Sequence, residues 1–241
     1  MEIAGFIPLD FTVWRGHAAC VLMTPKCNFR CPYCNHPFLV ETPKMLEWED
    51  PDEILDEIHK NLDGLTAVVI SGGEPTLQHD LQKFCKKLRG TGLDIMLETN
   101  GSRPALLEKL IKGRLVDYVA MDIKAPLSQY VKVTKAGHAD IDNVAVSKDI
   151  LLHGDGKIDY EFRTTFIPDV VTEKDLDMIV WDLQDAKRYV LQQFDPETCI
   201  DDAFEKKPML TFRQLKEIAE NLKFNGELIV RTEDKEEIIN E

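Results

Sequence analysis

The chain has 241 residues, of which 44% are hydrophobic and 30% are charged, and its formal net charge is -14. These values are typical of a globular protein with one substantial core, and the negative charge disfavours nucleic acids and anionic membranes as partners. The sequence has no apolar run long enough to cross a bilayer and no basic start of a signal peptide. We therefore expect a cytoplasmic protein.

Strand and helix signals alternate along the chain. Short apolar runs rich in β-branched residues predict buried parallel strands at 18–23, 65–70, 93–97, 115–121, 158–166 and 188–194. Capping residues and helical spacing predict intervening helices that begin near Asp50, Leu81, Ser102, Thr172 and Thr211. No repeat or flexible linker divides the chain, so we expect one α/β domain whose ligands bind where parallel strands end.

Three of the six cysteines, Cys27, Cys31 and Cys34, crowd into a loop after the first of these strands. In a cytoplasmic chain such crowding indicates a metal site rather than disulfides. Three thiolates at this spacing can wrap one cubane iron–sulfur cluster, whereas a fully protein-ligated cluster takes four cysteines. One iron would therefore lack a protein ligand, which marks the place where a substrate or cofactor binds.

The remaining cysteines and one histidine leave a different reading open. A zinc ion could take His36 as its fourth ligand, although zinc sites more often consist of two spaced pairs. Cys20 lies in an apolar strand, Cys85 belongs to an apolar helix stripe, and Cys199 is isolated in an acidic loop. The alternative outside the enzymes is thus a non-catalytic zinc or iron–sulfur binding protein.

Polar residues gather at the predicted strand ends, where they suit the ammonium, carboxylate and ribose groups of a charged cofactor. They are Gly72, Gly73, Glu74 and Pro75 after the second strand, Glu98, Thr99 and Asn100 at the third, and Asp122 and Lys124 at the fourth. Arg163 points opposite to Phe162 and Thr164, so it faces either solvent or the interior. In the interior its guanidinium needs a carboxylate partner, from the cofactor or from an acidic strand end.

The Cys-x3-Cys-x2-Cys loop, with the aromatic Tyr33 before its last cysteine, resembles the signature of the radical S-adenosylmethionine superfamily. This resemblance implies a partial (β/α)6 TIM-like barrel at about 16–195, with a helix–strand extension at about 208–241, and a single 4Fe–4S cluster. In that superfamily the open iron binds S-adenosylmethionine, and electron transfer cleaves it to a 5′-deoxyadenosyl radical. The chain would then be an oxygen-sensitive oxidoreductase.

Within the superfamily, the stretches CNFRCPYC, SGGEPTLQ, ETNG and MDIKAP are similar to those of glycyl radical enzyme activating enzymes, most of all the activating proteins of anaerobic ribonucleoside-triphosphate reductase. The resemblance implies that the backbone of 72–75 contacts the ammonium of S-adenosylmethionine and that Lys124 and Arg163 lie near this cofactor. It also implies a monovalent cation held by Glu98, Thr99 and Asp122.

The same resemblance implies that the substrate is a glycyl radical enzyme similar to anaerobic ribonucleoside-triphosphate reductase. The chain has no cysteine-rich insertion for a further cluster, so the electron would come from flavodoxin or ferredoxin. The long segments 125–142 and 195–210 follow strand ends and are expected to form the rim on which the target docks.

Two departures bear on the choice among relatives. Activating enzymes commonly have Cys-His-Asn-Pro at the last cysteine, whereas this chain has Asn35 and His36 in exchanged order. A histidine that pyruvate formate-lyase activators place after their last barrel strand has no counterpart at 191–196, which favours the reductase-activator type. The small-molecule alternative is 7-carboxy-7-deazaguanine synthase, whose usual Cys-Asp-Thr is also replaced here.

Overall fold

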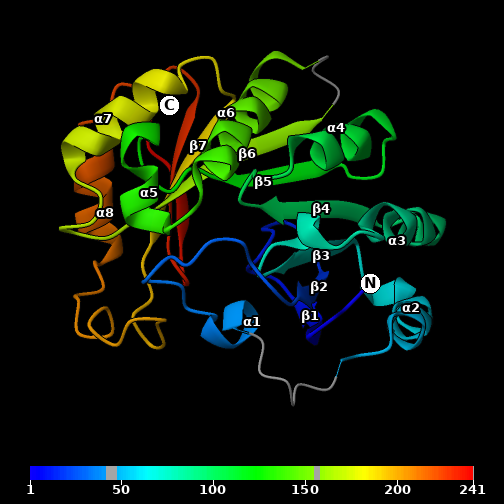
Figure 1. The fold of residues 1–241 in the computed structure, drawn as a ribbon. Helices are drawn as coiled ribbons and strands as arrows, with labels where there is room; N and C mark the ends of the chain where they lie inside the picture. Colours follow the sequence, from blue (N-terminus) through cyan, green and yellow to red (C-terminus); the bar gives the residue numbers. More distant parts are fainter. Residues whose placement is uncertain (42–47, 155–157, 241) are drawn as a thin grey trace.

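The computed structural model describes residues 1–41, 48–154 and 158–240. Within these ranges one sheet of nine strands runs in chain order from edge to edge (Figure 1). The strands are β1 (Gly5–Asp10), β2 (Ala19–Thr24), β3 (Ala67–Gly72), β4 (Asp94–Thr99), β5 (Tyr118–Asp122), β6 (Asp159–Phe166), β7 (Arg188–Gln193), β8 (Glu227–Arg231) and β9 (Glu236–Ile238). Strands β2 to β8 are parallel, and β1 and β9 pair antiparallel at the two edges.

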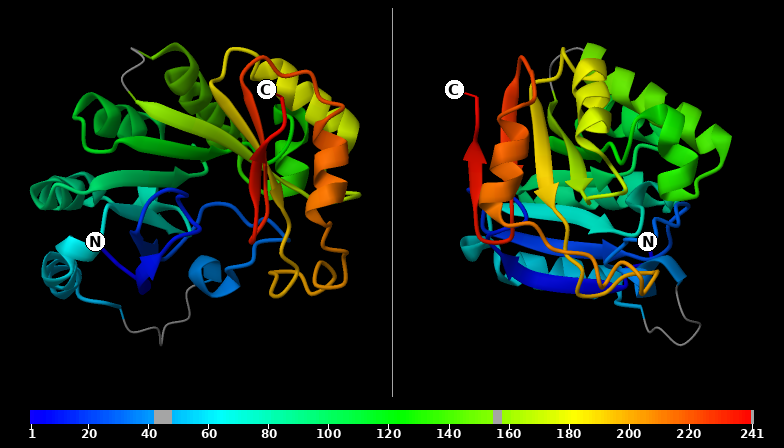
Figure 2. Two further views of the ribbon diagram at one scale, coloured as in Figure 1. Left: turned by 180° about the vertical axis from the view of Figure 1, so that it is seen from behind. Right: turned by 90° about the vertical axis from the view of Figure 1, so that its left-hand side faces the viewer.

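Helices connect the parallel strands and lie along the outer face of the curved sheet (Figures 1 and 2). The helices are α1 (Pro37–Glu41), α2 (Pro51–Lys60), α3 (Leu81–Leu88), α4 (Pro104–Lys112), α5 (Tyr130–Thr134), α6 (His138–His153), α7 (Glu173–Asp182) and α8 (Phe212–Ala219). Capping boxes at Thr172 and Thr211 fix the starts of α7 and α8, as their sequences predict. No described helix is long and apolar enough to span a membrane.

The fold confirms the predicted α/β architecture as a curved parallel sheet that does not close. The two edges, β1 and β9, are not paired with one another in the described residues. Arg15, in the β1–β2 connection, instead donates from Nη2 to the carbonyl oxygens of Thr232 and Glu233, each at 3.3 Å, in the connection between β8 and β9. Side-chain contacts therefore link the sheet across its gap.

Strand alternation gives the sheet two different faces. The outer face packs under the helices and carries the main core, including Leu22, Ile70 and Phe162. The inner face carries small or apolar residues near the strand starts, such as Ala19, Ala67 and Met96. Toward the strand ends the residues on this same face are polar. They belong to this face because β-strand positions two apart point to the same side of the sheet. The polar strand ends therefore lie above an apolar floor.

The C-terminal extension takes part in this interior. Arg231 on β8 forms a two-pronged ion pair with Glu161 on β6, at 2.6 and 2.9 Å, and Glu161 also accepts a hydrogen bond from Tyr118 at 3.0 Å. Glu161 is 2% exposed, so its charge depends on these partners. The pair ties β8 to the strands that carry the candidate site.

Some elements differ from the sequence-based expectation. The segment 125–142, expected as a long rim, contains a 3-10 turn, α5 and the first residues of α6. Helix α6 was not predicted. Its buried side includes the polar Ser147 among apolar residues, so the apolar positions do not form a continuous helical stripe in the sequence. Strand β1 has a mostly exposed or half-buried pattern, so it lacks the continuous apolar run that marked the other strands.

Candidate active site

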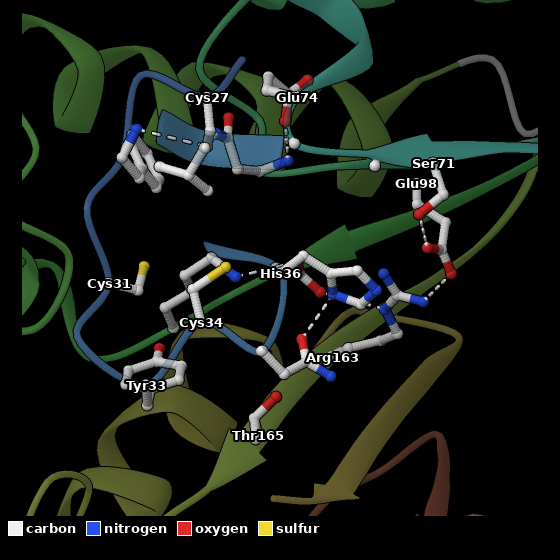
Figure 3. A pocket seen from close by; sticks show the side chains of 18 of the residues that line it. Cys27, Cys31, Tyr33, Cys34, His36, Ser71, Glu74, Glu98, Arg163 and Thr165 are labelled. Atoms are coloured by element: carbon white, nitrogen blue, oxygen red, sulfur yellow. Dashed lines mark hydrogen bonds and ion pairs between the residues drawn. The ribbon is translucent and has the colours of Figure 1, made fainter. Parts of the chain in front are cut away.

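A cavity of about 330 Å³ opens at the carboxyl ends of the strands, and all fourteen residues predicted from the sequence line it. In Figure 3 the cysteines lie on one side of the cavity, and Ser71, Glu98 and Arg163 lie on the other. Cysteines from the loop after β2 thus face polar groups from the ends of β3 to β6. The structure brings the predicted residues together; their contacts with a cofactor remain a prediction.

The cysteine loop is held by hydrogen bonds from three other parts of the chain. The Arg30 amide donates to the Thr134 carbonyl at the end of α5 at 2.8 Å, and the Asp201 amide donates to the Pro32 carbonyl at 2.9 Å. Asn100, after β4, donates from Nδ2 to Asn28 Oδ1 at 3.0 Å. These anchors position the loop mainly through its backbone and Asn28, and Asn100 Nδ2 also lies 3.8 Å from Cys27 Sγ.

The thiols fit a cluster in their chemistry. All three are free of disulfides, and Cys27, Cys31 and Cys34 face one cavity. Burial raises the pKa of Cys27 to about 11 and that of Cys31 to about 12, so both are protonated at neutral pH in the absence of metal. Metal binding would displace these protons, as it does wherever thiolates become ligands. Among the described residues the buried Asn28 Nδ2 has no hydrogen-bond partner, which adds an unsatisfied donor in this loop.

Two glycines, one at the end of β3 and one directly after it, let this strand end pack against the cysteine loop. Gly72 has φ +118°, and a Cβ there would lie 2.2 Å from the Thr24 backbone nitrogen. A Cβ on Gly73 would lie 2.3 Å from the Lys26 carbonyl oxygen. The Gly73 and Glu74 amides donate to the Thr24 and Lys26 carbonyls, both at 2.8 Å. The glycines therefore serve a close backbone contact, which the sequence suggested only for a bound ligand.

We predict that Gly73→Ala displaces the cysteine loop, because the new methyl group meets fixed backbone atoms at Lys26. The iron bound after anaerobic reconstitution should fall by about half or more, and the free energy of unfolding should drop by about 1–3 kcal/mol. Gly90→Ala is the matched control, since nothing lies within 4 Å of its Cβ position. Equal iron contents and unfolding midpoints in the two variants would contradict the prediction.

Glu74 lies at the centre of the strand ends and is 1% exposed. Its Oε1 accepts hydrogen bonds from the Thr76 amide at 3.0 Å, from the Thr76 hydroxyl and from the Thr99 hydroxyl at 2.7 Å. Its Oε2 accepts from the Asn100 amide at 2.7 Å. Burial raises the pKa of Glu74, and these donors oppose that rise. The side chain thus joins the ends of β3 and β4, a role that the sequence did not suggest.

Arg163 faces the interior and is 7% exposed, which resolves the choice that strand alternation left open. Its partners are acidic strand ends: Nη1 lies 2.5 Å from Glu98 Oε1, and Nε lies 3.1 Å from Asp122 Oδ1. Lys124 Nζ lies 3.0 Å from Asp122 Oδ2. Burial alone would raise the pKa of Asp122, but Lys124 and Arg163 outweigh it and hold that pKa below its usual value.

His36 also lines the cavity, and its imidazole points toward Arg163 (Figure 3). Its Nδ1 is paired with Asn35 Oδ1 at 2.8 Å. Burial lowers the pKa of His36, which favours the neutral ring at neutral pH. In the described part of the chain no three His, Cys, Asp or Glu side chains converge on a single-ion site.

Several cavity residues lay outside the sequence-based set. They include Ser71, which donates to Glu98 Oε2 at 2.5 Å, and Thr165, Gln192 and Asp195. Thr165 stands two positions after Arg163 and so shares its face, and Gln192 is the penultimate residue of β7. The sequence contains both patterns. Thr165 and Gln192 are uncharged, however, and an uncharged polar residue near a strand end does not by itself indicate a binding site.

The segment after β7 contacts the cysteine loop directly. Besides the Asp201 amide, the ring of Phe204 packs beside Tyr33, with centroids 6.2 Å apart. Cys199 is buried in this segment but does not line the cavity. The expected rim at 195–210 is therefore part of the support for the predicted cluster ligands.

Comparisons with known proteins agree with this geometry. The model of the Radical SAM superfamily matches residues 21–148. A Methanocaldococcus jannaschii protein, provisionally named as a glycyl-radical enzyme activating enzyme, is 33% identical over 95% of both chains. A 7-carboxy-7-deazaguanine synthase of Hyperthermus butylicus is 43% identical, but over 33% of each chain.

A solved structure of TYW1 with a lysine-pyruvate adduct bound shares the fold. Its TM-score is 0.63 at 17% identity, with 92% of this chain and 80% of that chain covered. The superfamily binds a 4Fe–4S cluster and S-adenosylmethionine, which confirms the cofactors expected from the cysteine loop. This chain belongs to the radical S-adenosylmethionine superfamily.

Proposed function

We propose that this radical S-adenosylmethionine enzyme installs a glycyl radical on a partner protein similar to anaerobic ribonucleoside-triphosphate reductase. The observation that carries the proposal is the extent of the match to the M. jannaschii protein, which spans 95% of both chains. The match to the deazaguanine synthase spans only 33% of each chain. The whole-length similarity therefore supports an activating enzyme over the small-molecule alternative.

In the proposal Cys27, Cys31 and Cys34 hold three irons of a 4Fe–4S cluster. Such a cluster would supply one electron for the reductive cleavage of S-adenosylmethionine to methionine and a 5′-deoxyadenosyl radical, which would take a hydrogen atom from the target glycine. A reduced flavodoxin or ferredoxin would supply the next electron to the cluster. The chain's own residues bind and orient the participants.

Charge and backbone geometry support a cofactor position between the cysteines and the strand ends. Lys124 and Arg163 give this side of the cavity two cations suited to a carboxylate. Burial alone would lower the pKa of Lys124, but Asp122 and other nearby acidic groups together hold that pKa well above its usual value, so the charge of Lys124 persists. Gly72 and Gly73 line the same cavity, so their backbone lies beside the proposed cofactor position.

The target would reach the cavity from the strand ends, over the rim formed by 125–142 and 195–210. Both segments contact the cysteine loop, through Thr134 and Asp201. Docking there would bring the target glycine near the cofactor and cover the mouth. Water would then be excluded from the radical.

The test mixes the reduced, reconstituted protein and S-adenosylmethionine with candidate glycyl radical enzymes and records electron paramagnetic resonance spectra. A glycyl radical on one candidate, formed only with both cofactor and reductant, is the expected result. The signal should vanish when the target glycine is replaced by alanine. If 5′-deoxyadenosine forms while no candidate gains a radical, the proposal fails and the small-molecule alternative takes its place.

A further inference from the structure

Two carboxylates and two cations meet at the ends of β4, β5 and β6. Glu98, Asp122, Lys124 and Arg163 form this strand-end charge cluster, and its ion pairs are 2.5 to 3.1 Å long. Their formal charges cancel. The resemblance to activating enzymes implied instead that Glu98, Thr99 and Asp122 surround a monovalent cation.

Backbone pairing fixes the position of the arginine. Asp122 and Arg163 are direct partners in the parallel register of β5 and β6. Both side chains point to the inner face, and Arg163 is 7% exposed, so its guanidinium is largely removed from bulk water. A buried guanidinium requires carboxylate partners, which Glu98 and Asp122 provide.

The oxygen atoms that an inorganic cation would need already have partners. Arg163 takes Glu98 Oε1 and Asp122 Oδ1, whereas Ser71 and Lys124 take Glu98 Oε2 and Asp122 Oδ2. All four carboxylate oxygens are thus engaged by donors from the protein.

The third expected ligand is engaged as well. The Thr99 hydroxyl donates to Glu74 Oε1 at 2.7 Å and accepts from the Gly101 amide at 3.1 Å. A cation at this point would also lie beside a fixed guanidinium, and like charges repel strongly in a buried site. The residues present do not fit a monovalent cation.

We propose that the guanidinium of Arg163 takes the place of the monovalent cation between Glu98 and Asp122, so that this chain binds S-adenosylmethionine without an inorganic cation. The proposal rests on membership of the superfamily and not on the identity of the radical's target. Arg163 then has a second task beside its expected contact with the cofactor, because it neutralises the carboxylates that form this wall.

The experiment measures the dissociation constant of S-adenosylmethionine for the reconstituted protein by calorimetry, with potassium, sodium or tetramethylammonium as the only monovalent cation. Tetramethylammonium is too large for a site among carboxylates. The wild-type constants should agree within about twofold. The melting temperature of the cluster-free protein gives a second readout and should be equal in the three salts.

Arg163→Gln removes the charge and should create a cation site. Its cofactor affinity in tetramethylammonium should recover by about tenfold in potassium or sodium. Arg188→Gln is the control, because Arg188 pairs with Asp159 and Glu227 at the opposite strand ends and should gain no cation dependence.

Two results would overturn the proposal. One is a wild-type affinity that falls about tenfold or more when potassium is replaced by tetramethylammonium. The other is a folded Arg163→Gln protein with no cation dependence. The wild-type comparison decides the matter even if that variant does not fold, and neither measurement involves a glycyl radical enzyme.

Discussion

Anaerobic reconstitution of Cys31→Ser should yield a protein that binds little iron and no longer cleaves S-adenosylmethionine. Cys31 is 6% exposed and lines the cavity, and its loss leaves two thiols, too few to hold the cluster. Formation of 5′-deoxyadenosine should fall on the order of a thousandfold or more, because the electron donor is removed and not merely displaced. Iron analysis and chromatography of the nucleoside measure the two losses.

Cys199→Ala is the matched control for that prediction. Cys199 is also buried, and burial with nearby acidic groups and Cys34 raises its pKa to about 11. Cys199 is therefore a neutral thiol at neutral pH, and it lies near Cys34 of the cysteine loop. Wild-type iron content and cleavage are expected in this variant. A loss like that of Cys31→Ser would reveal a fourth protein ligand and refute the open iron.

The sequence predicts the site well where strand geometry decides positions. Carboxyl ends of parallel strands meet at one edge of a sheet, so Glu98, Asp122 and Arg163 had to come together once their strands were identified. The alternation of side chains placed Arg163 opposite to Phe162. The sequence was sufficient to place these residues, because the meeting of strand ends and the alternation of side chains both depend only on position within a strand.

Side-chain roles that depend on distant partners were not predictable. The sequence placed Glu74 among cofactor contacts, but its carboxylate is taken up by Thr76, Thr99 and the Asn100 amide. The strand-end rule places the loops after β3 and β4 at one edge of the sheet, but nothing local in the sequence shows that Thr99 and Asn100 donate to the Glu74 carboxylate. The same limitation hid the contact between the segment after β7 and the cysteine loop.

These observations give the cavity two kinds of wall. The cysteine loop is held through its backbone, whereas the opposite wall consists of charges that satisfy one another. A cofactor with both ammonium and carboxylate groups can replace the existing ion-pair partners of these side chains. The electrostatic cost is small, because each buried charge still has an opposite charge beside it. This arrangement makes Glu74, which supports both walls, a sensitive position.

Glu74→Gln should destabilise the cluster-free protein by about 3 kcal/mol, since hydrogen bonds to a buried charged group contribute about 1.5–3 kcal/mol each. The glutamine offers one oxygen where Glu74 offers two, so its amide group must face a donor at Thr76 or Asn100. The melting temperature should fall by about 6–12 °C for a chain of this length. Urea unfolding under reducing conditions gives the free energy.

Glu108→Gln is the control for Glu74→Gln. Glu108 forms an exposed ion pair with Lys112 on α4, and such pairs contribute little to stability, so the change should be within about 0.5 kcal/mol. The comparison separates two roles for Glu74. If it contacts S-adenosylmethionine directly, Glu74→Gln weakens cofactor binding and leaves unfolding unchanged. If it joins the ends of β3 and β4, stability falls before any cofactor is added, because the Asn100 amide loses the acceptor that holds it beside the cysteine loop.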